Sequence, residues 1–374
     1  MIRRILALVN KEFLHLRNDW WLPAFMLIGG ALELLAIGWA TSRPISNLPM
    51  IVFDQDKTPA SRELVITLEN AETFRLEEQV YEMATIENAM DRGQINVALI
   101  IPSGFADQIA SSSETAILSV ILNGAESIPA MEALRSLEAV TRGMSDQIMI
   151  ERIGMNPDEF SGFDMSLLVW FNETLSAALY TTPAEMGLML EFTVLLFAAL
   201  AFSRERELGT LEQLLVMPFS SLQLILGKAI PVIMIGFIDF VILLGMVNIA
   251  FDVPVRGSLP LLLGLAFLYI FVELGKGMVI SVISKTQQQA FLLVMMFALT
   301  DFMFTGYAAP VEGMPAVVQF VAKFIPAHHW LTIMRGIMLK GAGLEVLWPN
   351  VLALLILGLV IGTFSWRFVR RALD

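Results

Sequence analysis

The sequence predicts an α-helical integral membrane protein with six transmembrane helices and an extracytoplasmic α/β domain inserted between the first and second spans. Of its 374 residues, 56% are hydrophobic and 16% are charged. Soluble domains instead have about 45–50% apolar and about 25% charged residues. The excess apolar residues form long runs, each near the roughly 20 residues that a helix needs to cross a hydrocarbon core. We therefore expect lipid to surround much of the chain.

The N-terminal segment predicts two helices. Residues 1–18 predict an amphipathic helix at the membrane interface, because apolar residues recur there at helical spacing. These residues are Ile2, Ile5, Leu6, Val9, Phe13 and Leu16. An ordinary helix packed on the bundle is the alternative. Residues 19–42 contain the first span, 23–41, which is expected to be retained because a charged segment precedes it and no small-residue cleavage site follows it.

Residues 43–182 predict a folded α/β domain, because strand-like and helix-like stretches alternate. The expected strands are 50–53, 95–101 and 116–122, and the expected helices are 58–70, 83–93 and 125–153. Thr58 followed by Pro59 is typical of a helix start. The segment holds 8 Lys and Arg against 21 Asp and Glu. The acidity is therefore local. It indicates a solvated acidic surface that could bind a partner or attract cations, and it argues against nucleic-acid binding.

Residues 183–374 predict a five-helix transmembrane domain. Its apolar runs are 184–203, 229–250, 259–283, 289–309 and 347–366. Residues 310–346 contain three prolines and one short apolar face, and they predict a re-entrant segment on the outer side. His328, His329 and Trp330 are expected near the outer membrane interface, where tryptophan is favoured.

The positive charges predict the orientation. With the N-terminus in the cytoplasm, the short cytoplasmic flanks carry eleven Lys and Arg, and the short outer loops carry four. Lysine and arginine concentrate on the cytoplasmic side of membrane proteins. Both termini and residues 204–217 are therefore expected inside, and residues 43–182 outside.

Several kinds of site are excluded by composition. The sequence has no cysteine and three histidines, so no disulfide, thiol nucleophile or metal centre is expected. A phosphate loop needs glycines followed by Lys and Ser or Thr. The nearest strings, 226–229 and 274–277, lack the upstream glycine and the hydroxyl residue. We therefore expect no catalytic residues, no ATP site and no cofactor bound by this chain.

The segment after the second span is the most informative stretch. Residues 204–217 read Arg-Glu-Arg-Glu-Leu-Gly-Thr-Leu-Glu-Gln-Leu-Leu-Val-Met. They predict one short amphipathic helix on the cytoplasmic face, which Pro218 ends. A helix this short needs a surface to pack against. The bilayer surface or a partner protein could provide it.

Residues 204–215 resemble the signature of ABC-2 type exporter permeases, which include drug-efflux transporters. Residues 54–64 resemble the start of that family's extracytoplasmic domain, and residues 305–315 resemble the loop before its last span. The resemblance implies two paired permease chains above two separate ABC ATPase subunits, which use ATP and magnesium to drive export of a hydrophobic or amphipathic substrate.

On this chain, the resemblance makes residues 204–217 the coupling helix that receives the ATPase together with the N-terminal helix. The ATPase-coupling residues it implies are Arg204, Glu205, Arg206, Glu207, Gly209, Thr210, Glu212 and Gln213. Together with the charge asymmetry, the resemblance suggests a bacterial inner membrane with residues 43–182 in the periplasm. The second permease could be identical or a sister chain, and a periplasmic adaptor is left open.

Ionisable residues inside the spans are candidates for a translocation path. Burying each costs about 2.5–3.5 kcal/mol on insertion scales, so they should face a cavity, a partner or one another. The candidates are Glu191, Asp239, Glu273, Lys276 and Asp301. Glu273 and Lys276 are three residues apart and can simply pair on one helix face. Glu191 and Asp239 have no local partner.

Two other functions compete with an exporter subunit. An ion-coupled secondary transporter could use the intramembrane carboxylates, but the sequence has no convincing internal repeat of the kind such transporters contain. A membrane receptor or scaffold could use the acidic domain, but that function leaves the six spans and the 204–217 helix unexplained.

Overall fold

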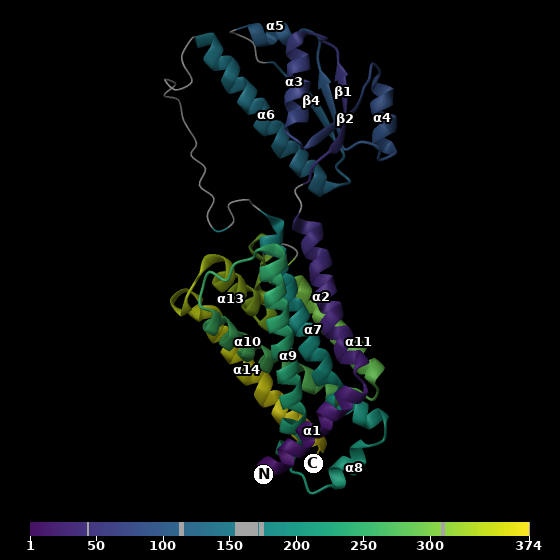
Figure 1. The fold of residues 1–374 in the computed structure, drawn as a ribbon, viewed down its shortest axis with the longest axis vertical. Coiled ribbons are helices and arrows are strands. Elements are labelled where there is room, and N and C mark those ends of the chain that lie inside the picture. The colour runs from purple at the N-terminus through teal and green to yellow at the C-terminus, as the bar shows by residue number, and fades with distance from the viewer. Residues whose placement is uncertain (43–44, 112–115, 154–170, 172–175, 308–310, 374) are drawn as a thin grey trace. The chain divides into compact units, whose positions relative to one another are not determined.

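The computed structural model describes residues 1–42, 45–111, 116–153, 171, 176–307 and 311–373. The chain divides into two compact units (Figure 1). One is helical and combines Met1–Arg43 with Leu168–Asp374, and the other is Pro44–Leu167.

The helical unit contains a bundle of long helices with shorter ones at its ends (Figure 1). Its elements are α1 (Ile2–Asn18), α2 (Trp21–Ser42), α7 (Ala177–Glu207), α8 (Leu211–Val216), α9 (Ser221–Phe251), α10 (Leu259–Ile283), α11 (Gln287–Phe304), the 3-10 turn η2 (Val311–Gly313), α12 (Ala316–Ala322), α13 (Pro326–Lys340) and α14 (Leu344–Leu373). Among the described residues, α2, α7, α9, α10 and α14 are long and apolar enough to cross a membrane. The chain is therefore a helical, multi-pass membrane protein.

Helix α11 lies where the sequence predicts a further span, over 289–309. It has 18 residues and begins with three glutamines. It is thus slightly shorter than the roughly 20 apolar residues of a typical span.

Helix α7 is the central element of this unit. It packs against α2, α9, α10, α11 and α13, and most of its apolar stretch is buried. Trp330, from α13, is 1% exposed and stacks on Tyr269 of α10 with ring centroids 5.1 Å apart. The ring of Trp330 therefore packs inside the unit, and its expected depth near the outer membrane interface stays a prediction.

Polar side chains mark where several of these helices begin. Ser220 and Gln223 form a capping box at the start of α9. Ser258 and Thr286 each accept a backbone N–H in the first turn of α10 and α11. Such caps satisfy N–H groups that have no partner within the helix. They explain why each long helix starts where its loop ends.

The second unit is a four-stranded sheet with helices on both faces (Figure 1). Its elements are β1 (Leu48–Asp54), α3 (Pro59–Asn70), β2 (Phe74–Gln79), α4 (Met83–Asp91), β3 (Val97–Ile101), α5 (Phe105–Ala110), β4 (Ser119–Leu122) and α6 (Ser127–Ile153). The strand order is β2-β1-β3-β4; β1 is parallel to β2 and β3, and β4 is antiparallel to β3.

Alternating residues of β1 build the two cores of this unit. Met50 and Val52 pack with α3 and α6 on one face. Ile51 packs with α4 on the other face. Successive side chains of a strand point to opposite faces, so one apolar strand can support helices on both sides. Strand β2 and helix α5 are not among the elements expected from the sequence.

Candidate functional site

The stretch expected to be one coupling helix is broken in two. Residues 204–207 complete α7, Leu208 ends that helix, and α8 begins only at Leu211. Gly209 has φ +70°, a conformation that costs glycine little and other residues more. The prediction of a continuous helix over 204–217 is therefore wrong at Gly209, where the chain turns from α7 into α8.

Glu205 is the hub of an ionic network that joins α7, α1 and α9. Lys11 Nζ lies 2.6 Å and Lys228 Nζ 3.2 Å from Glu205 Oε1. Lys228 Nζ also lies 2.9 Å from Glu12 Oε1. The Thr210 hydroxyl donates to Glu205, and the Thr210 N–H donates to the Glu205 carbonyl at 2.9 Å. Charge-assisted hydrogen bonds of this kind are stronger than neutral ones, so the end of α7 is held to its neighbours.

The charged residues around Glu205 also face the bundle. These contacts are Arg204 Nη2 to Asp19 Oδ2 at 2.9 Å, Arg206 Nη1 to the carbonyls of Val282 at 2.7 Å and Ser284 at 2.6 Å, and the Gln287 N–H to Glu207 Oε2 at 2.6 Å. Arg206 and Glu207 thereby bind the end of α10 and the start of α11. The four charged side chains organise the junction between helices.

The exposed part of the segment is α8 and its flanks. Val216 is 87% and Leu208 59% exposed, and Met217 is half exposed. Glu212 and Gln213 are also exposed. The residues implied for ATPase coupling therefore divide into an anchoring set at 204–207, of which only Glu205 is buried, a turn at Gly209 and Thr210, and an exposed pair on α8, Glu212 and Gln213.

Helix α8 is attached to the bundle through a small apolar cluster. Leu214 packs with Leu8 of α1 and Leu224 of α9, and all three are buried. A Cβ added at Gly227 would lie 2.6 Å from Leu8 Cβ, so glycine allows α1 to approach α9 closely. Leu8 is not among the apolar residues expected to face the membrane. Of those, Ile2 and Leu6 are largely exposed, so α1 has one face on the bundle and one face outside it.

A second polar cluster lies inside the bundle. Lys276 Nζ is 2.6 Å from Asp301 Oδ2, 2.7 Å from Glu273 Oε2 and 3.3 Å from Glu191 Oε1. The Tyr269 hydroxyl donates to Glu191 Oε2 at 3.2 Å. Four of the five residues proposed for a translocation path therefore meet at one point. They come from α7, α10 and α11, and a single lysine faces three carboxylates.

Asp239, the fifth residue, is separate from this cluster. It is 1% exposed, and its Oδ2 has no hydrogen-bond partner among the described residues. Unpartnered buried polar atoms are rare and need an explanation. Glu191 has a partner after all, in Lys276, although none is visible in its own stretch of sequence.

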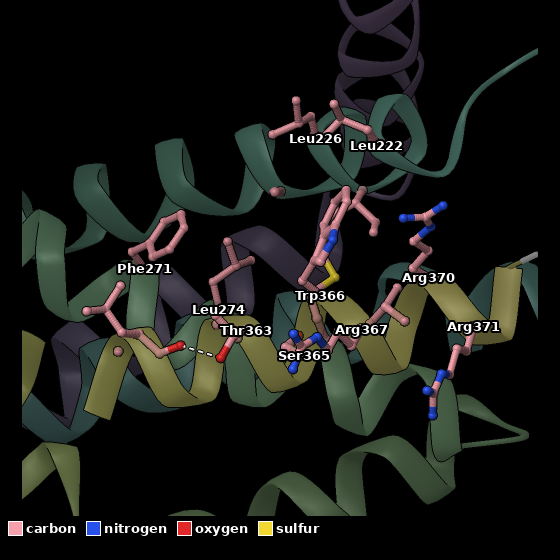
Figure 2. Close-up of a pocket in the computed structure, with 18 residues that line it drawn as sticks. Leu222, Leu226, Phe271, Leu274, Thr363, Ser365, Trp366, Arg367, Arg370 and Arg371 are labelled. Carbon is pink, nitrogen blue, oxygen red and sulfur yellow. Dashed lines mark hydrogen bonds between the residues drawn. The ribbon is translucent and has the colours of Figure 1, made fainter. Parts of the chain in front are cut away.

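The cavities place these residues in different surroundings. Glu191, Tyr269 and Trp330 line a pocket of about 10 Å³, about enough for one water molecule. Lys276 borders a cavity of about 270 Å³ beside α14. A cavity of about 890 Å³ lies between α9, α10 and α14, and none of the five path candidates lines it (Figure 2).

The two further stretches that resemble the family, residues 54–64 and 305–315, have structural roles. Asp54 Oδ1 accepts the N–H groups of Asp56 and Lys57 at 2.9 Å each. Thr58 caps α3 with Pro59 in its first turn, which confirms the predicted helix start. In the other motif, residues 308–310 lie outside the described residues, and the Gly306 carbonyl accepts hydrogen bonds from Tyr180 and Arg335.

Asp56 joins this turn to α5. It accepts a hydrogen bond from the Thr58 hydroxyl and the backbone N–H groups of Gly104, at 2.9 Å, and Ala106, at 3.1 Å. The Thr58 hydrogen bond, with the two backbone N–H groups, lowers the pKa of Asp56 against a smaller opposing effect of burial. The acidic motif therefore holds a loop together.

Sequence reasoning missed the partners that complete both clusters. Lys11, Glu12 and Lys228 surround Glu205, and Tyr269 binds Glu191. A signal existed only for Lys228, a charged residue beside an apolar run. The others are paired across nearly 80 or more residues of sequence, and only the packing of helices brings them together.

Comparison with known proteins gives consistent matches along the chain. A family described as "ABC-2 family transporter protein" matches residues 20–367. The chain is 26% identical to "Probable multidrug ABC transporter permease YbhR" of Escherichia coli (strain K12) over 371 residues, or 99% of each chain. It is 26% identical to "Probable multidrug ABC transporter permease YbhS" of the same strain over 384 residues, 100% of this chain and 98% of that protein. It is 24% identical to "Inner membrane transport permease YhhJ" of that strain over 362 residues, 96% and 94% of the two chains.

Proposed function

The chain belongs to the ABC-2 family of transporter proteins, and on that premise we propose that it is the permease subunit of an ATP-driven exporter. It moves a hydrophobic or amphipathic substrate out of the cytoplasm or the inner leaflet. A separate ABC ATPase hydrolyses ATP with magnesium, and this chain converts the resulting motion into transport. The relatives named as multidrug permeases support this assignment.

The observation that carries the proposal is the construction of the α7–α8 junction. Helix α8 presents exposed apolar side chains, and Val216 is 87% exposed. Its base is tied through Glu205 and Thr210 to α7. A partner that binds α8 can therefore displace α7, because the contact surface and the central helix are joined by hydrogen bonds and ion pairs.

The proposed docking surface consists of Leu208, Glu212, Gln213, Val216 and Met217. It combines apolar and polar side chains at the end of a bundle, as protein interfaces do. Helix α8 is too short to be stable without tertiary contacts. Leu214 supplies the contact with the bundle, which leaves the remaining face for the ATPase.

The Lys276 cluster supports a substrate with a cationic group. Three carboxylates surround one ammonium, and Asp239 adds a further acid without a partner for Oδ2 among the described residues. Buried charges in spans mark transport pathways in many membrane proteins. Excess acid at this depth would attract a cation that enters from a cavity.

The membrane arrangement is part of the same proposal. Six helices span the bacterial inner membrane, with α11 as the sixth, and both termini and α8 lie in the cytoplasm. The α/β unit lies in the periplasm, where an adaptor could bind it. The permease works as a pair, with an identical or a sister chain.

The test is formation of a complex with an ABC ATPase from the same organism. The substitution Val216→Glu should reduce binding of the ATPase at least about tenfold, because burying a valine contributes roughly 1.5–3 kcal/mol. Co-purification and ATPase stimulation in proteoliposomes measure this effect. The matched control is Val346→Glu on α14, which is 64% exposed and lies outside the proposed surface.

Equal loss in both variants would contradict docking at α8. Transport that ignores ATP and stops when the proton or sodium gradient is removed would instead support an ion-coupled transporter. A stable chain that neither binds an ATPase nor transports would support a receptor or scaffold.

A further inference from the structure

The cavity between α9, α10 and α14 has apolar walls and the size of a ligand site. Its volume is about 890 Å³, within the range of pockets for small molecules. Leu226, Leu274 and Met278 are among its apolar lining residues. Gly362 of α14 also lines it, and a Cβ there would meet only Phe271, at 4.0 Å. The cavity can therefore accept a hydrocarbon chain.

The end of this cavity is basic. Arg367, Arg370 and Arg371 line it from the end of α14, and no acidic residue is among the lining residues that the structure describes. Figure 2 shows Arg370 and Trp366 on the side of α14 that faces Leu222 and Leu226, and Arg371 extending the opposite way. Arg370 therefore lies on the side of α14 that bears the apolar walls, and the guanidinium group of Arg371 does not.

The site spans from mid-helix to the helix end. Gly358 and Arg371 both line it, and a helical rise of 1.5 Å per residue separates them by about 20 Å. That distance exceeds half of a hydrocarbon core about 30 Å thick. The geometry matches a molecule with a charged head at the surface and a chain that reaches inward.

Several other basic residues near this end of the bundle pair with acids. Lys11 and Lys228 pair with Glu205, and Arg204 pairs with Asp19. Arg367, in contrast, makes no ion pair or side-chain hydrogen bond within the part of the chain that the structure describes. Its charge is available for an external anion, and guanidinium groups fit phosphate oxygens well.

We propose that this cavity binds an anionic phospholipid of the cytoplasmic leaflet. The phosphate contacts Arg367 and Arg370, Trp366 lies at the level of the headgroup, and an acyl chain follows the apolar walls toward Phe271. The assignment to that leaflet rests on the orientation in the proposed function. The lipid is a bound component beside α9 and α14, distinct from the substrate expected near Lys276.

Lipid binding can be measured without ATP or an ATPase. The purified full-length chain is titrated with phosphatidylglycerol or phosphatidylcholine in detergent, and bound lipid is counted by native mass spectrometry. Phosphatidylglycerol should bind more tightly. Each basic residue near an anionic lipid contributes about a fivefold affinity gain, so Arg367→Gln with Arg370→Gln should weaken phosphatidylglycerol binding roughly 25-fold.

A second variant tests the cavity without changing charge. Gly362→Leu should fill the space beside Phe271 and reduce binding of phosphatidylglycerol, while improving helix propensity. Its control is Gly245→Leu, where the added Cβ also meets nothing within 4 Å. The control for charge is Lys285→Gln, an exposed residue outside the cavity. Both controls should bind lipid as the original chain does.

Three results would overturn the proposal. They are equal binding of the two lipids, unchanged binding in the arginine double variant, and unchanged binding in Gly362→Leu. Loss of chain–chain association in Gly362→Leu would also overturn it, because a second copy would then occupy the cavity. A failure to bind an ATPase, which would contradict the exporter assignment, leaves these lipid measurements unaffected.

Discussion

Lys276 is the residue on which the intramembrane cluster depends. Its ammonium lies within 3.3 Å of Glu191, Glu273 and Asp301. Removing it leaves three buried carboxylates without a counter-charge. Removing one acid instead reduces an excess of negative charge. The two kinds of substitution should therefore differ in their effect on stability.

Lys276→Met should lower the free energy of unfolding by about 3–5 kcal/mol, the usual cost of breaking a buried ion pair from one side. Asp239→Asn should leave the stability of the chain unchanged and alter transport, because Asp239 Oδ2 lacks a partner among the described residues. Denaturant unfolding in detergent and uptake of a cationic dye into proteoliposomes measure the two effects.

Lys340→Met, at an exposed position, is the control for loss of a lysine. Equal destabilisation by Lys276→Met and Lys340→Met would show that the cluster contributes nothing. Unchanged transport in both Asp239→Asn and Glu191→Gln would remove these residues from the translocation path.

Asp56 should make the α/β unit sensitive to acid. Its pKa is lowered in the folded state by the Thr58 hydrogen bond and the N–H groups of Ala106 and Gly104. A lowered folded pKa gives stability that is complete above the unfolded value, about 3.9, and is lost as pH falls through the folded value. Protection of the α5 amides in the full chain, measured as exchange relative to the intrinsic rate at the same pH, should therefore fall below about pH 4.

Asp56→Asn should flatten this acid response and speed exchange at Gly104 and Ala106 at neutral pH. Asp107 is an exposed residue of α5. The substitution Asp107→Asn should leave the acid response unchanged. An Asp56→Asn profile that still tracks the original chain below pH 4 would assign the acid sensitivity to other groups.

Residue-scale prediction from the sequence succeeded where partners are local. The Thr58 cap and the Glu273–Lys276 pair are separated by three positions or fewer from their partners, and both are present. The contact between Glu191 and Lys276 spans 85 positions. It depends on how α7 packs on α10, which no pattern within either helix specifies.

At the scale of elements, substitutions in the α7–α8 turn can test whether this turn positions α8. Gly209 has φ +70°. Gly209→Val should strain this turn at a cost of order 1–3 kcal/mol and should weaken ATPase binding by misplacing α8. Co-purification with the ATPase measures the effect. Gly209→Asn should retain binding, because asparagine tolerates the left-handed conformation.

Equal binding by the Val and Asn variants would mean that the turn does not position α8. Reduced binding in both, with normal unfolding, would indicate that the partner needs contact with the glycine backbone itself. Either result separates conformation from contact at this position.

The elements that were not expected from the sequence have weak strand or helix patterns. Strand β2 reads Phe-Arg-Leu-Glu-Glu-Gln, which is too charged to resemble a buried strand, and it forms because β1 offers a parallel partner. The continuous helix expected over 204–217 failed because helical spacing of leucines outweighed the single glycine. Tertiary pairing and one backbone angle decided both cases.

For the whole molecule, the proposed orientation across the membrane predicts which residues a reagent outside the cell can reach. The absence of cysteine allows single cysteines to be introduced without background labelling. In intact spheroplasts, Tyr81→Cys in the α/β unit should react with an impermeant maleimide. Val216→Cys on α8 should react only after the membrane is opened. Both positions are exposed, so access to the reagent is the only difference expected.

Reaction of both cysteines in intact cells would contradict the proposed topology, and labelling of neither in opened cells would indicate misfolding. Ile128→Cys, an exposed position within the α/β unit, provides a second outer site. Its labelling should match that of Tyr81→Cys.

For the whole molecule, the composition and the lengths of the apolar runs were sufficient to predict the class of protein, but not to predict how its helices pack. Long apolar runs predict membrane helices because the bilayer sets their length. The central position of α7 follows from its packing against α2, α9, α10, α11 and α13. Such packing depends on how the side chains along whole helix faces fit together. Single-residue patterns do not encode it.

Helix α7 is one continuous helix of 31 residues, and it carries both Glu191 and Glu205. These two side chains lie on the same stiff segment, about 21 Å apart along its axis. If ATPase binding at α8 shifts this segment, occupancy of the acidic cluster must shift the affinity for the ATPase by the same factor, since binding linkage is reciprocal. Binding of substrate should therefore raise or lower the affinity of the chain for the ATPase subunit before any nucleotide is hydrolysed.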